Sequence, residues 1–298
     1  MKQLTLILAL GLVLFSCKEK LDKKDISLKE MQSGDGGRYT PILDDADMTP
    51  IFKSIGDKDL HLNIYLPEEH HAGDLNTCLV FFFGGGFING SPEQFAEQCR
   101  HFSALGYVAI SADYRVISRD DCTAVESVLD GKSAIRYIRE HADELGIDTS
   151  KIIVGGGSAG GGLALMCATD NPDFTDEKDN TAISCKPNGM VLFNPVVDME
   201  EHPFRIRKFD GAAEALSPIK RKDLKIAPTI MFHGTADEIA SFERTKTFEE
   251  LAKKQGTDIQ LIAFEGLEHG FFQRNKHEGK YYEETLKLTE GWLKERGW

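Results

Sequence analysis

The stretch IIVGGGSAGGG, residues 152–162, carries six glycines and one serine directly behind three β-branched residues. Glycine loses more backbone freedom on folding than any other residue, so this density indicates a tight turn or a close backbone approach. Two patterns fit the stretch. As G-x-S-x-G, it makes Ser158 an exposed nucleophile at a strand-to-helix turn; as G-x-G-x-x-G through Gly155, Gly157 and Gly160, it forms a loop that holds the phosphates of a dinucleotide. The neighbouring segments decide between the two.

The surrounding sequence disfavours the dinucleotide loop. That fingerprint usually opens the first strand-helix-strand unit of a domain, whereas several predicted strands precede Gly155. It also needs an acidic residue about 20 positions further on, at the end of the next strand. The next predicted strand ends at Phe193-Asn194-Pro195, without such a carboxylate. Ser158 instead lies between the strand KIIV and the helix GGLALMCAT, which is the context that a nucleophile elbow requires.

Composition and charge narrow the class of protein. The chain has 298 residues, of which 41% are apolar and 28% are charged, as in ordinary soluble globular proteins. This length allows one large α/β domain or two small ones. The formal net charge of −13 argues against nucleic acid as a partner, because phosphate binding needs a basic patch and no Lys/Arg run supplies one.

The N-terminus has the pattern of an export signal. Met1-Lys2 gives a positive start, and the apolar run at residues 4–15 is too short to span a bilayer as a helix. The run ends in LFSC, which resembles a bacterial lipobox. This resemblance implies that residues 1–17 are a lipoprotein signal peptide and that Cys17 is lipidated as the first mature residue. A plain secretory signal or a buried helix is the alternative.

The segment that follows the signal is polar and poorly periodic. We expect residues 18–48 to be a tether or an arm on the surface. A lipid on Cys17 would place the protein in the bacterial cell envelope, exported and anchored to a membrane. Five cysteines remain besides Cys17, so at least one thiol is unpaired, and whether Cys99 and Cys122 pair stays open.

From residue 49 onward the chain alternates strands and helices. DLHLNIYLP (59–67) alternates apolar and polar residues and predicts a half-buried strand on one edge of the sheet. Mostly continuous apolar runs predict strands buried on both faces of a parallel sheet, at residues 77–83, 107–114, 151–154, 189–196, 228–234 and 258–266. Helical spacing with end signals predicts helices at 91–106, 123–146, 241–256 and 280–298.

This alternation predicts a single α/β domain over residues 49–298, with a mostly parallel, doubly wound sheet of about eight strands. The stretch from about 197 to 226 does not continue the alternation of predicted strands and helices. We expect it to be a small insertion over the site rather than a second domain.

A nucleophilic serine needs a base and a group that orients the base. Asp237 directly follows the predicted strand PTIMFHG, and His269 follows the predicted strand DIQLIAFEG. Both positions lie at carboxyl ends of strands, where open α/β sheets keep their sites, and the order Ser158, Asp237, His269 is that of α/β-hydrolases. His233, inside a strand end, is expected to be structural.

The reaction also needs backbone N–H groups that bind the oxyanion. One comes from Ala159, directly after the nucleophile, and the others come from the glycine loop FFFGGGF, residues 81–87. Glycine is needed there because a Cβ would hold the substrate away from the backbone donors.

Together these motifs resemble the α/β-hydrolase superfamily, most closely the hormone-sensitive-lipase-like esterases and the bacterial acetyl-xylan and feruloyl-type carbohydrate esterases. GGGSAGG, FFFGGGF, SADYR, HGTAD and EHGF carry the resemblance over roughly residues 60–298. It implies the α/β-hydrolase fold. It also implies a triad and three oxyanion donors, which fall on Ser158, Asp237 and His269, and on Gly85, Gly86 and Ala159.

One position departs from the family pattern. The family loop begins His-Gly-Gly-Gly, whereas this chain has Phe83 before its three glycines. The family histidine holds the loop through hydrogen bonds, and Phe83 can hold it only by packing. Asp113 and Arg115, in SADYR, match a family segment beside this loop and are expected to support it rather than act on substrate.

The resemblance and the expected envelope location imply a serine carboxylic-ester hydrolase that needs no metal or organic cofactor. Its expected substrates are carbohydrate or small esters with short acyl groups, acetyl or feruloyl-type, and the small insertion argues against long-chain lipids. Two alternatives stay open. One is a small lipase or peptidase of the same fold, and the other is a surface lipoprotein that binds glycans with an inactive site, which only Phe83 favours.

Overall fold

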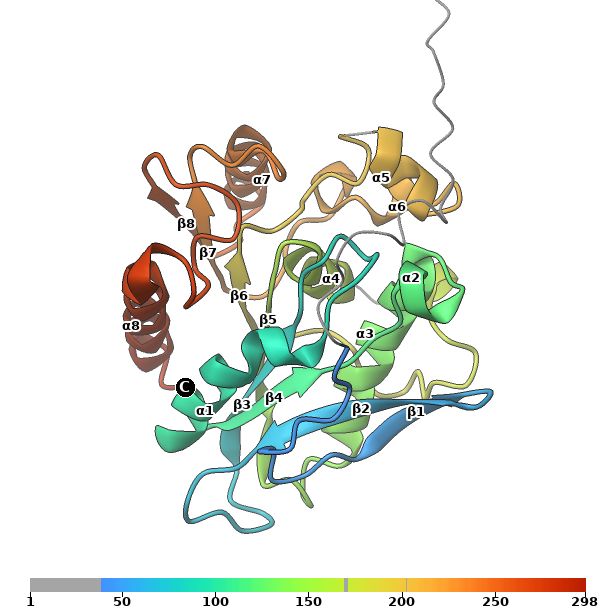
Figure 1. Cartoon of the computed structure of the whole chain (residues 1–298), viewed down its shortest axis with the longest axis vertical. Coiled ribbons are helices and arrows are strands. Elements are labelled where there is room, and N and C mark those ends of the chain that lie inside the picture. Colours follow the sequence, from blue (N-terminus) through green and yellow to red (C-terminus); the bar gives the residue numbers. More distant parts are fainter. Residues whose placement is uncertain (1–38, 169–170, 202) are drawn as a thin grey trace, which may run out of the picture.

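The computed structural model describes residues 39–168, 171–201 and 203–298; the predicted signal peptide with Cys17 and residues 18–38 lie outside these ranges. An eight-stranded sheet in the order β1-β2-β4-β3-β5-β6-β7-β8 forms the centre (Figure 1). The strands are β1 (Ile51–Ile55), β2 (Lys58–Tyr65), β3 (Asn76–Phe82), β4 (Val108–Ala112), β5 (Ile147–Gly157), β6 (Gly189–Phe193), β7 (Thr229–Gly234) and β8 (Ile259–Phe264). β2 is antiparallel to β1 and β4, and the other neighbours are parallel, which confirms the predicted fold class.

Helices cover both faces of the sheet (Figure 1). They are α1 (Ala96–Ala104), α2 (Ile117–Asp120), α3 (Ala124–Glu140), α4 (Ala159–Cys167), α5 (Pro203–Lys208), α6 (Ala213–Leu216), α7 (Phe242–Lys254) and α8 (Lys280–Glu295). Short 3₁₀ turns are η2 (Pro92–Phe95), η3 (Pro172–Phe174), η4 (Pro218–Lys220) and η5 (His277–Gly279). Side chains of α1 and α8 pack on one face, and those of α3, α4 and α7 pack on the other.

β3 shows why the central strands are continuously apolar. Val80 and Phe82 belong to the core under α3 and α4, whereas Leu79 and Phe81 belong to the core under α1 and α8. Successive side chains of a strand point to opposite faces, so a strand covered on both sides needs apolar residues at every position. The carboxyl ends of these strands therefore reach the site from a rigid, fully buried layer.

The prediction of an edge strand at residues 59–67 was wrong in one respect. That segment forms β2, but β2 lies between β1 and β4, and β1 forms the edge. The five side chains of β1 are exposed or half-buried, so its sequence carries little apolar signal. β2 is buried over most of its length because β1 and β4 flank it.

Residues 39–48, the last part of the predicted tether, pack against the domain. Leu43 is buried, and its N–H donates to Asn63 Oδ1 at 2.7 Å. The Tyr39 hydroxyl donates to Asp113 at 2.6 Å, and Met48 forms a β-bridge with Ile64. The packed part of the chain therefore begins before residue 49.

The stretch at 197–226 contains α5, α6 and η4 and contacts the loop FFFGGGF. Lys208 Nζ donates to Gly86 O at 2.9 Å, and the Phe209 ring packs edge-on against Phe87 with centroids 5.5 Å apart. The insertion therefore holds one side of the glycine loop.

Three further observations concern only the described ranges. None of their helices is long and apolar enough to cross a membrane. They hold no cluster of three or more His, Cys, Asp or Glu side chains that could bind a metal ion. Their five cysteines form no disulfide, so Cys99 and Cys122 are not paired with each other.

Candidate active site

Ser158 stands at the turn between β5 and α4. Its φ of 55° and ψ of −117° are strained for a residue with a side chain, and its N–H donates to Phe193 O at 2.9 Å. The turn places the side chain at the carboxyl edge of the sheet and at the N-terminus of α4, where the helix dipole favours negative charge. This is the geometry that the G-x-S-x-G pattern predicts.

His269 and Asp237 lie in the loops after β8 and β7, and both reach Ser158. His269 Nε2 is 2.8 Å from Ser158 Oγ, and His269 Nδ1 is 2.7 Å from Asp237 Oδ2. The other carboxylate oxygen, Asp237 Oδ1, accepts the N–H groups of Ile239 and Ala240 at 2.9 Å each. The structure thus brings together the three side chains that the sequence singled out.

Asp237 is buried, yet its surroundings favour the charged form. Burial would raise its pKa, but hydrogen bonds from His233 and His269, the charge of His269 and the N–H of Ala240 hold the pKa well below its usual value. An ionised Asp237 keeps the proton of His269 on Nδ1, which leaves Nε2 to accept the proton of Ser158.

His233, expected to be structural, also contacts Asp237. Its Nε2 lies 3.2 Å from Asp237 Oδ2 and 2.9 Å from Ala240 O. Because both neighbours are acceptors, this nitrogen carries the proton and donates to both. From its position in the sequence His233 was expected to be structural only, whereas it lies directly behind Asp237.

Three backbone N–H groups are candidates for binding an oxyanion at Ser158: Gly85 and Gly86 line the pocket over it, and Ala159 follows it directly in the chain. Gly85 and Gly86 follow β3 with φ values of 128° and 67°, which residues with a side chain rarely adopt. Ala159 is the first residue of α4, so its N–H has no partner within the helix. Within the described part of the chain none of these three N–H groups makes a hydrogen bond. They are available to an oxyanion.

Phe83, which stands where the family has histidine, is fixed by Tyr114. The two rings stack with centroids 4.0 Å apart and planes 12° apart, and the Tyr114 hydroxyl donates to Phe83 O at 2.6 Å. Gln94 adds a second anchor, because its Oε1 accepts the N–H of Gly84 at 2.6 Å. Packing and two hydrogen bonds thus hold the glycine loop without the histidine.

The SADYR segment supports the loop through its tyrosine rather than its charged residues. Asp113 accepts the N–H of Tyr114 at 2.9 Å and does not touch the loop. Arg115 pairs with Asp130 of α3 through two hydrogen bonds of 2.7 and 2.8 Å. The expectation that Asp113 and Arg115 support the loop themselves therefore needs correction: Tyr114, between them, makes the contact.

Asn194 is a site residue that the sequence analysis did not identify. It follows β6 with a φ of 36°, accepts the N–H of Gly270 at 3.1 Å, and places its Nδ2 3.4 Å from His269 Nε2. It lies directly after a buried parallel strand, as Asp237 and His269 do, so its position was the signal that could have found it.

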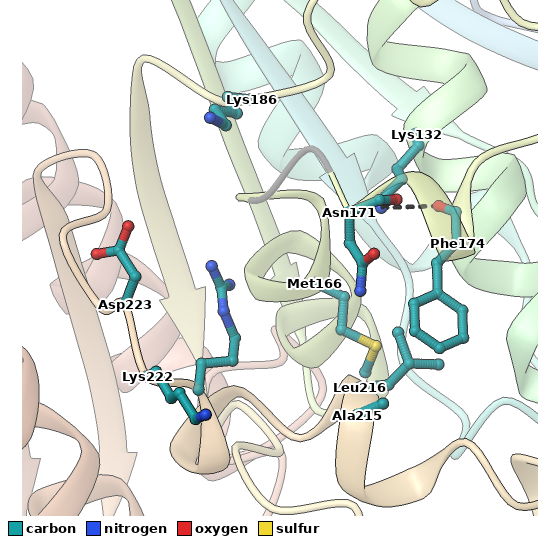
Figure 2. Close-up of a pocket in the computed structure, with 10 residues that line it drawn as sticks. Lys132, Met166, Asn171, Phe174, Lys186, Ala215, Leu216, Lys222 and Asp223 are labelled. Atoms are coloured by element: carbon teal, nitrogen blue, oxygen red, sulfur yellow. Dashed lines mark hydrogen bonds between the residues drawn. The ribbon is translucent and has the colours of Figure 1, made fainter.

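These elements enclose a pocket of ≈ 340 Å³ over Ser158. The glycine loop forms one wall, and Ile239 and Phe272 add apolar surface. A separate cavity of ≈ 330 Å³ lies at the C-terminal end of α4, where Lys132 Nζ donates to Phe174 O at 2.7 Å (Figure 2). Because Met166 near the end of α4 lines that cavity while Ser158 precedes the helix, the two spaces are distinct.

Comparison with known proteins finds relatives named as esterases and lipases. The BD-FAE family model matches residues 62–251. Esterase LipC of Mycobacterium tuberculosis is 27% identical over 65% of this chain and 52% of its own length. Lipase 2 of Moraxella sp. is 35% identical over 72% of this chain and 59% of its own length. The chain thus spans roughly half to three fifths of these curated relatives.

A solved structure matches the chain over nearly its whole length. The apo form of Thermogutta terrifontis esterase 2 is 39% identical with a TM-score of 0.84, and the match covers 88% of this chain and 98% of that one. The fold is therefore the α/β-hydrolase fold that the sequence motifs indicated. With the family model spanning more than half of its residues, the chain belongs to the BD-FAE family of α/β-hydrolases.

Proposed function

We propose that this protein is a serine carboxylic-ester hydrolase in which Ser158 is the nucleophile, His269 the general base and Asp237 the residue that orients the base. The observation that carries the proposal is the pair of contacts from His269, 2.8 Å to Ser158 Oγ and 2.7 Å to Asp237 Oδ2. Hydrogen-bond reach between nucleophile, base and orienting carboxylate is the arrangement that activates a serine.

The first half of the reaction forms an acyl-enzyme. His269 Nε2 takes the proton of Ser158 as Oγ bonds the acyl carbon, and the carbonyl oxygen becomes an oxyanion. The N–H groups of Gly85, Gly86 and Ala159 stabilise this charge; losing one such donor typically costs ~10²–10³ in kcat. The bond between the acyl carbon and the alcohol oxygen then breaks, and the alcohol leaves with the proton from His269.

The second half releases the acid. Water gives a proton to His269 as its oxygen bonds the acyl carbon, and the same N–H groups hold the second oxyanion. Collapse breaks the bond to Ser158 Oγ, which recovers its proton from His269. Asp237 stays ionised throughout and stabilises the imidazolium in both steps.

For the substrate we propose short acyl groups, acetyl first and feruloyl-type second, on carbohydrate or small esters. The pocket over Ser158 is small and glycine-walled, with apolar surface from Ile239 and Phe272. Structures of Thermogutta terrifontis esterase 2 hold bound propionate and bound butyrate, at 39% and 38% identity to this chain. The rates at which the protein releases acetate from acetylated xylan and hydroxycinnamate from feruloylated xylan show which of the two acyl groups it prefers.

The activity test uses the full chain beside a Ser158→Ala variant. We expect the wild type to hydrolyse p-nitrophenyl acetate and the variant to lose the activity to near the uncatalysed background. Paraoxon provides a chemical readout, since Thermogutta terrifontis esterase 2 is phosphorylated by it. Ser158 should displace p-nitrophenolate and gain one diethylphosphoryl group by mass spectrometry. Turnover that survives in the variant, or labelling elsewhere, contradicts the proposal.

We propose the active enzyme over the alternative of an inactive glycan-binding protein. Phe83 was the only feature that favoured it, and the ring stacks on Tyr114 while the backbone donors of the loop remain available. No contact in the described residues favours a peptidase.

We also propose export and a lipid anchor at Cys17, from the lipobox-like LFSC at residues 14–17. Labelled palmitate fed to a bacterium that expresses the full chain should enter the wild type and not Cys17→Ser. Cys122→Ser, a matched control elsewhere in the chain, should keep the label. Equal labelling of both variants counts against an anchor at Cys17.

A further inference from the structure

A second pocket, of ≈ 350 Å³, adjoins the pocket over Ser158, because Gln94 and Gln273 line both. Its other walls come from α1, from the segment after Phe272 and from α8, which lie on the same face of the sheet (Figure 1). We call it the amide pocket, after its four amide side chains: Gln94, Gln98, Gln273 and Asn275. The two pockets therefore share a boundary formed by Gln94 and Gln273, which places the amide pocket beside the position of an ester at Ser158.

Two largely buried side chains of the amide pocket end in polar groups that make no hydrogen bond with the described residues. Gln98 is only 4% exposed and Tyr282 only 5%. Neither the Gln98 amide nor the Tyr282 hydroxyl makes a hydrogen bond with the part of the chain that the structure describes. The polar ends themselves keep contact with solvent, since neither belongs to the fully buried side-chain atoms that lack a hydrogen-bond partner in the described residues. Because both residues line the pocket, the amide and the hydroxyl are open to a polar ligand that enters it.

The pocket carries little uncompensated charge. Glu97 and Arg274, its two charged residues, pair with each other at 2.8 Å. Burial raises the pKa of Tyr282 to about 12, so its hydroxyl keeps its proton and can donate. An anionic or cationic ligand would have to compete with the ion pair, whereas a neutral ligand would not.

Amide and hydroxyl side chains both donate and accept hydrogen bonds, and this property selects the kind of ligand. A carboxamide offers donors and acceptors side by side, and a hydroxyl group both donates and accepts. A purely apolar acyl chain would displace water from the Gln98 amide and the Tyr282 hydroxyl and leave both without a partner, which sites with polar groups disfavour strongly. A compact group with several hydroxyls satisfies them together.

We propose that the amide pocket binds a neutral, hydroxyl-rich unit of the substrate, such as one sugar residue of an acylated glycoside, while the ester lies over Ser158. The inference rests on the proposed ester hydrolysis and adds where the polar part of the substrate is held. Gln98 and Tyr282 are binding residues in this account and take no part in the chemistry at Ser158.

The test compares two substrates, p-nitrophenyl acetate and a mono-O-acetyl methyl xyloside. Gln98→Met keeps the length of the side chain and removes its amide, and Tyr282→Phe removes one oxygen. We expect either variant to lose ~10-fold or more in kcat/KM on the sugar ester, with p-nitrophenyl acetate hydrolysis unchanged. Gln260→Met, on the exposed side of β8, is the matched control and should change neither rate.

Other outcomes overturn the inference. Equal losses on both substrates would mean that the variants damage the site as a whole, and unchanged rates on the sugar ester would mean that only water fills the pocket. If Gln98→Met proves unstable, Tyr282→Phe decides alone.

A binding measurement separates this inference from the proposed activity. Calorimetric titration of methyl xyloside into Ser158→Ala should show binding that weakens ~10-fold or more when Gln98→Met is added. If wild type fails to hydrolyse p-nitrophenyl acetate, the proposed function fails, yet this titration still tests the pocket. Absence of binding to Ser158→Ala overturns the sugar subsite even if p-nitrophenyl acetate is cleaved.

Discussion

The glycines around Ser158 are explained by neighbouring protein atoms rather than by a phosphate ligand. Gly160, the last glycine of the G-x-S-x-G pattern, lies so close to β3 that a Cβ would overlap the carbonyl oxygens of Phe82 and Phe83. The same position is the third glycine of the dinucleotide pattern. Here its bare backbone lets α4 begin directly against the end of β3, beside the glycine loop.

Gly160→Ala should therefore be strongly destabilising. The obstructing atoms are backbone oxygens, which cannot move aside without disturbing β3, and overpacking of this kind costs on the order of 3 kcal/mol or more. Gly291→Ala is the matched control, since Gly291 lies in α8 with nothing within 4 Å of the added carbon. It should stabilise the protein by about 0.5–1 kcal/mol. The urea concentration at the midpoint of unfolding measures the stability of both variants. A Gly160→Ala variant that unfolds at the same urea concentration as the wild type would contradict the packing explanation.

His233 should act as a positioning residue for Asp237. It donates one proton to two acceptors, Asp237 Oδ2 at 3.2 Å and Ala240 O at 2.9 Å, and its Nδ1 has no partner in the described residues. Losing a hydrogen bond to a charged group costs about 1.5–3 kcal/mol. We expect His233→Leu to lower kcat ~10- to 100-fold with little change in KM, and His233→Gln, which keeps a donor, to recover most of the rate. Equal loss in both variants would indicate a packing role alone.

Asp237→Asn tests the orienting carboxylate itself. The comparable substitution in a well-studied serine hydrolase lowers kcat by about 10⁴, because the imidazole takes the wrong tautomer. We expect a similar loss on p-nitrophenyl acetate, with paraoxon labelling of Ser158 slowed in proportion. A loss smaller than about tenfold would mean that His269 holds its tautomer without Asp237.

At the scale of elements, the glycine loop after β3 depends on three neighbours. Tyr114, at the end of β4, stacks on Phe83 and donates to its carbonyl, and Gln94 of η2 accepts the N–H of Gly84. Lys208, from the insertion, holds Gly86 O on the far side. The loop is thus fixed from three separate elements, which suits donors that must not reorganise during the reaction.

Gln94→Leu and Tyr114→Phe should therefore lower kcat on p-nitrophenyl acetate. Each removes one hydrogen bond that fixes the loop and leaves the triad contacts intact, so we expect ~10-fold losses. Gln98→Met, one turn along from Gln94 and outside the loop, should leave this rate unchanged. A rise in KM with unchanged kcat would mean that the loop binds substrate but does not stabilise the oxyanion.

The limits of sequence interpretation are clearest at this scale. Long apolar runs revealed the parallel strands β3 to β7, because burial on both faces leaves a continuous signal. The run at 258–266 located β8, but the expectation that it is buried on both faces was wrong: β8 lies at the second edge of the sheet, and only Ile259 and Phe264 are buried. β1 was not predicted from the sequence, because its side chains are exposed or half-buried and leave no continuous apolar run. Motif order singled out Ser158, Asp237 and His269, whereas Gln94 and Tyr114 reach the loop through tertiary packing, which local spacing does not encode.

At the scale of the molecule, one buried carboxylate joins the N-terminal arm to the layer beneath the site. Asp113 accepts from the Tyr39 hydroxyl at 2.6 Å and from the N–H of Tyr114 at 2.9 Å, and it lies 3.3 Å from Arg119 of α2. The Arg119 guanidinium lies 3.7 Å from the centre of the Tyr39 ring. Residues 39–48 are therefore tied to the strand end that carries Tyr114, so the charge state of Asp113 affects the stability of the whole domain.

The pH dependence of unfolding tests this connection. Burial raises the pKa of Asp113 to about 6, and the charge of Arg119 and the hydrogen bond from Tyr39 oppose the rise only in part. An unfolded aspartate titrates near pH 3.9, so between about pH 4 and 6 the folded protein holds a proton that the unfolded chain has lost. The contribution of Asp113 to the unfolding free energy should then fall as pH rises through this window, by on the order of 3 kcal/mol, and stay level above it.

Asp113→Asn removes this titration and keeps the shape of the side chain. The unfolding free energy of wild type minus that of the variant, from urea titrations between pH 4 and 7, should decrease up to about pH 6 and then become constant. A difference that increases with pH instead would mean that the ion pair with Arg119 outweighs burial, so that the folded protein prefers the charged carboxylate. In that case Arg119 would be the main tie between α2 and the strand end, and Arg119→Gln should cost more stability at pH 7 than at pH 4.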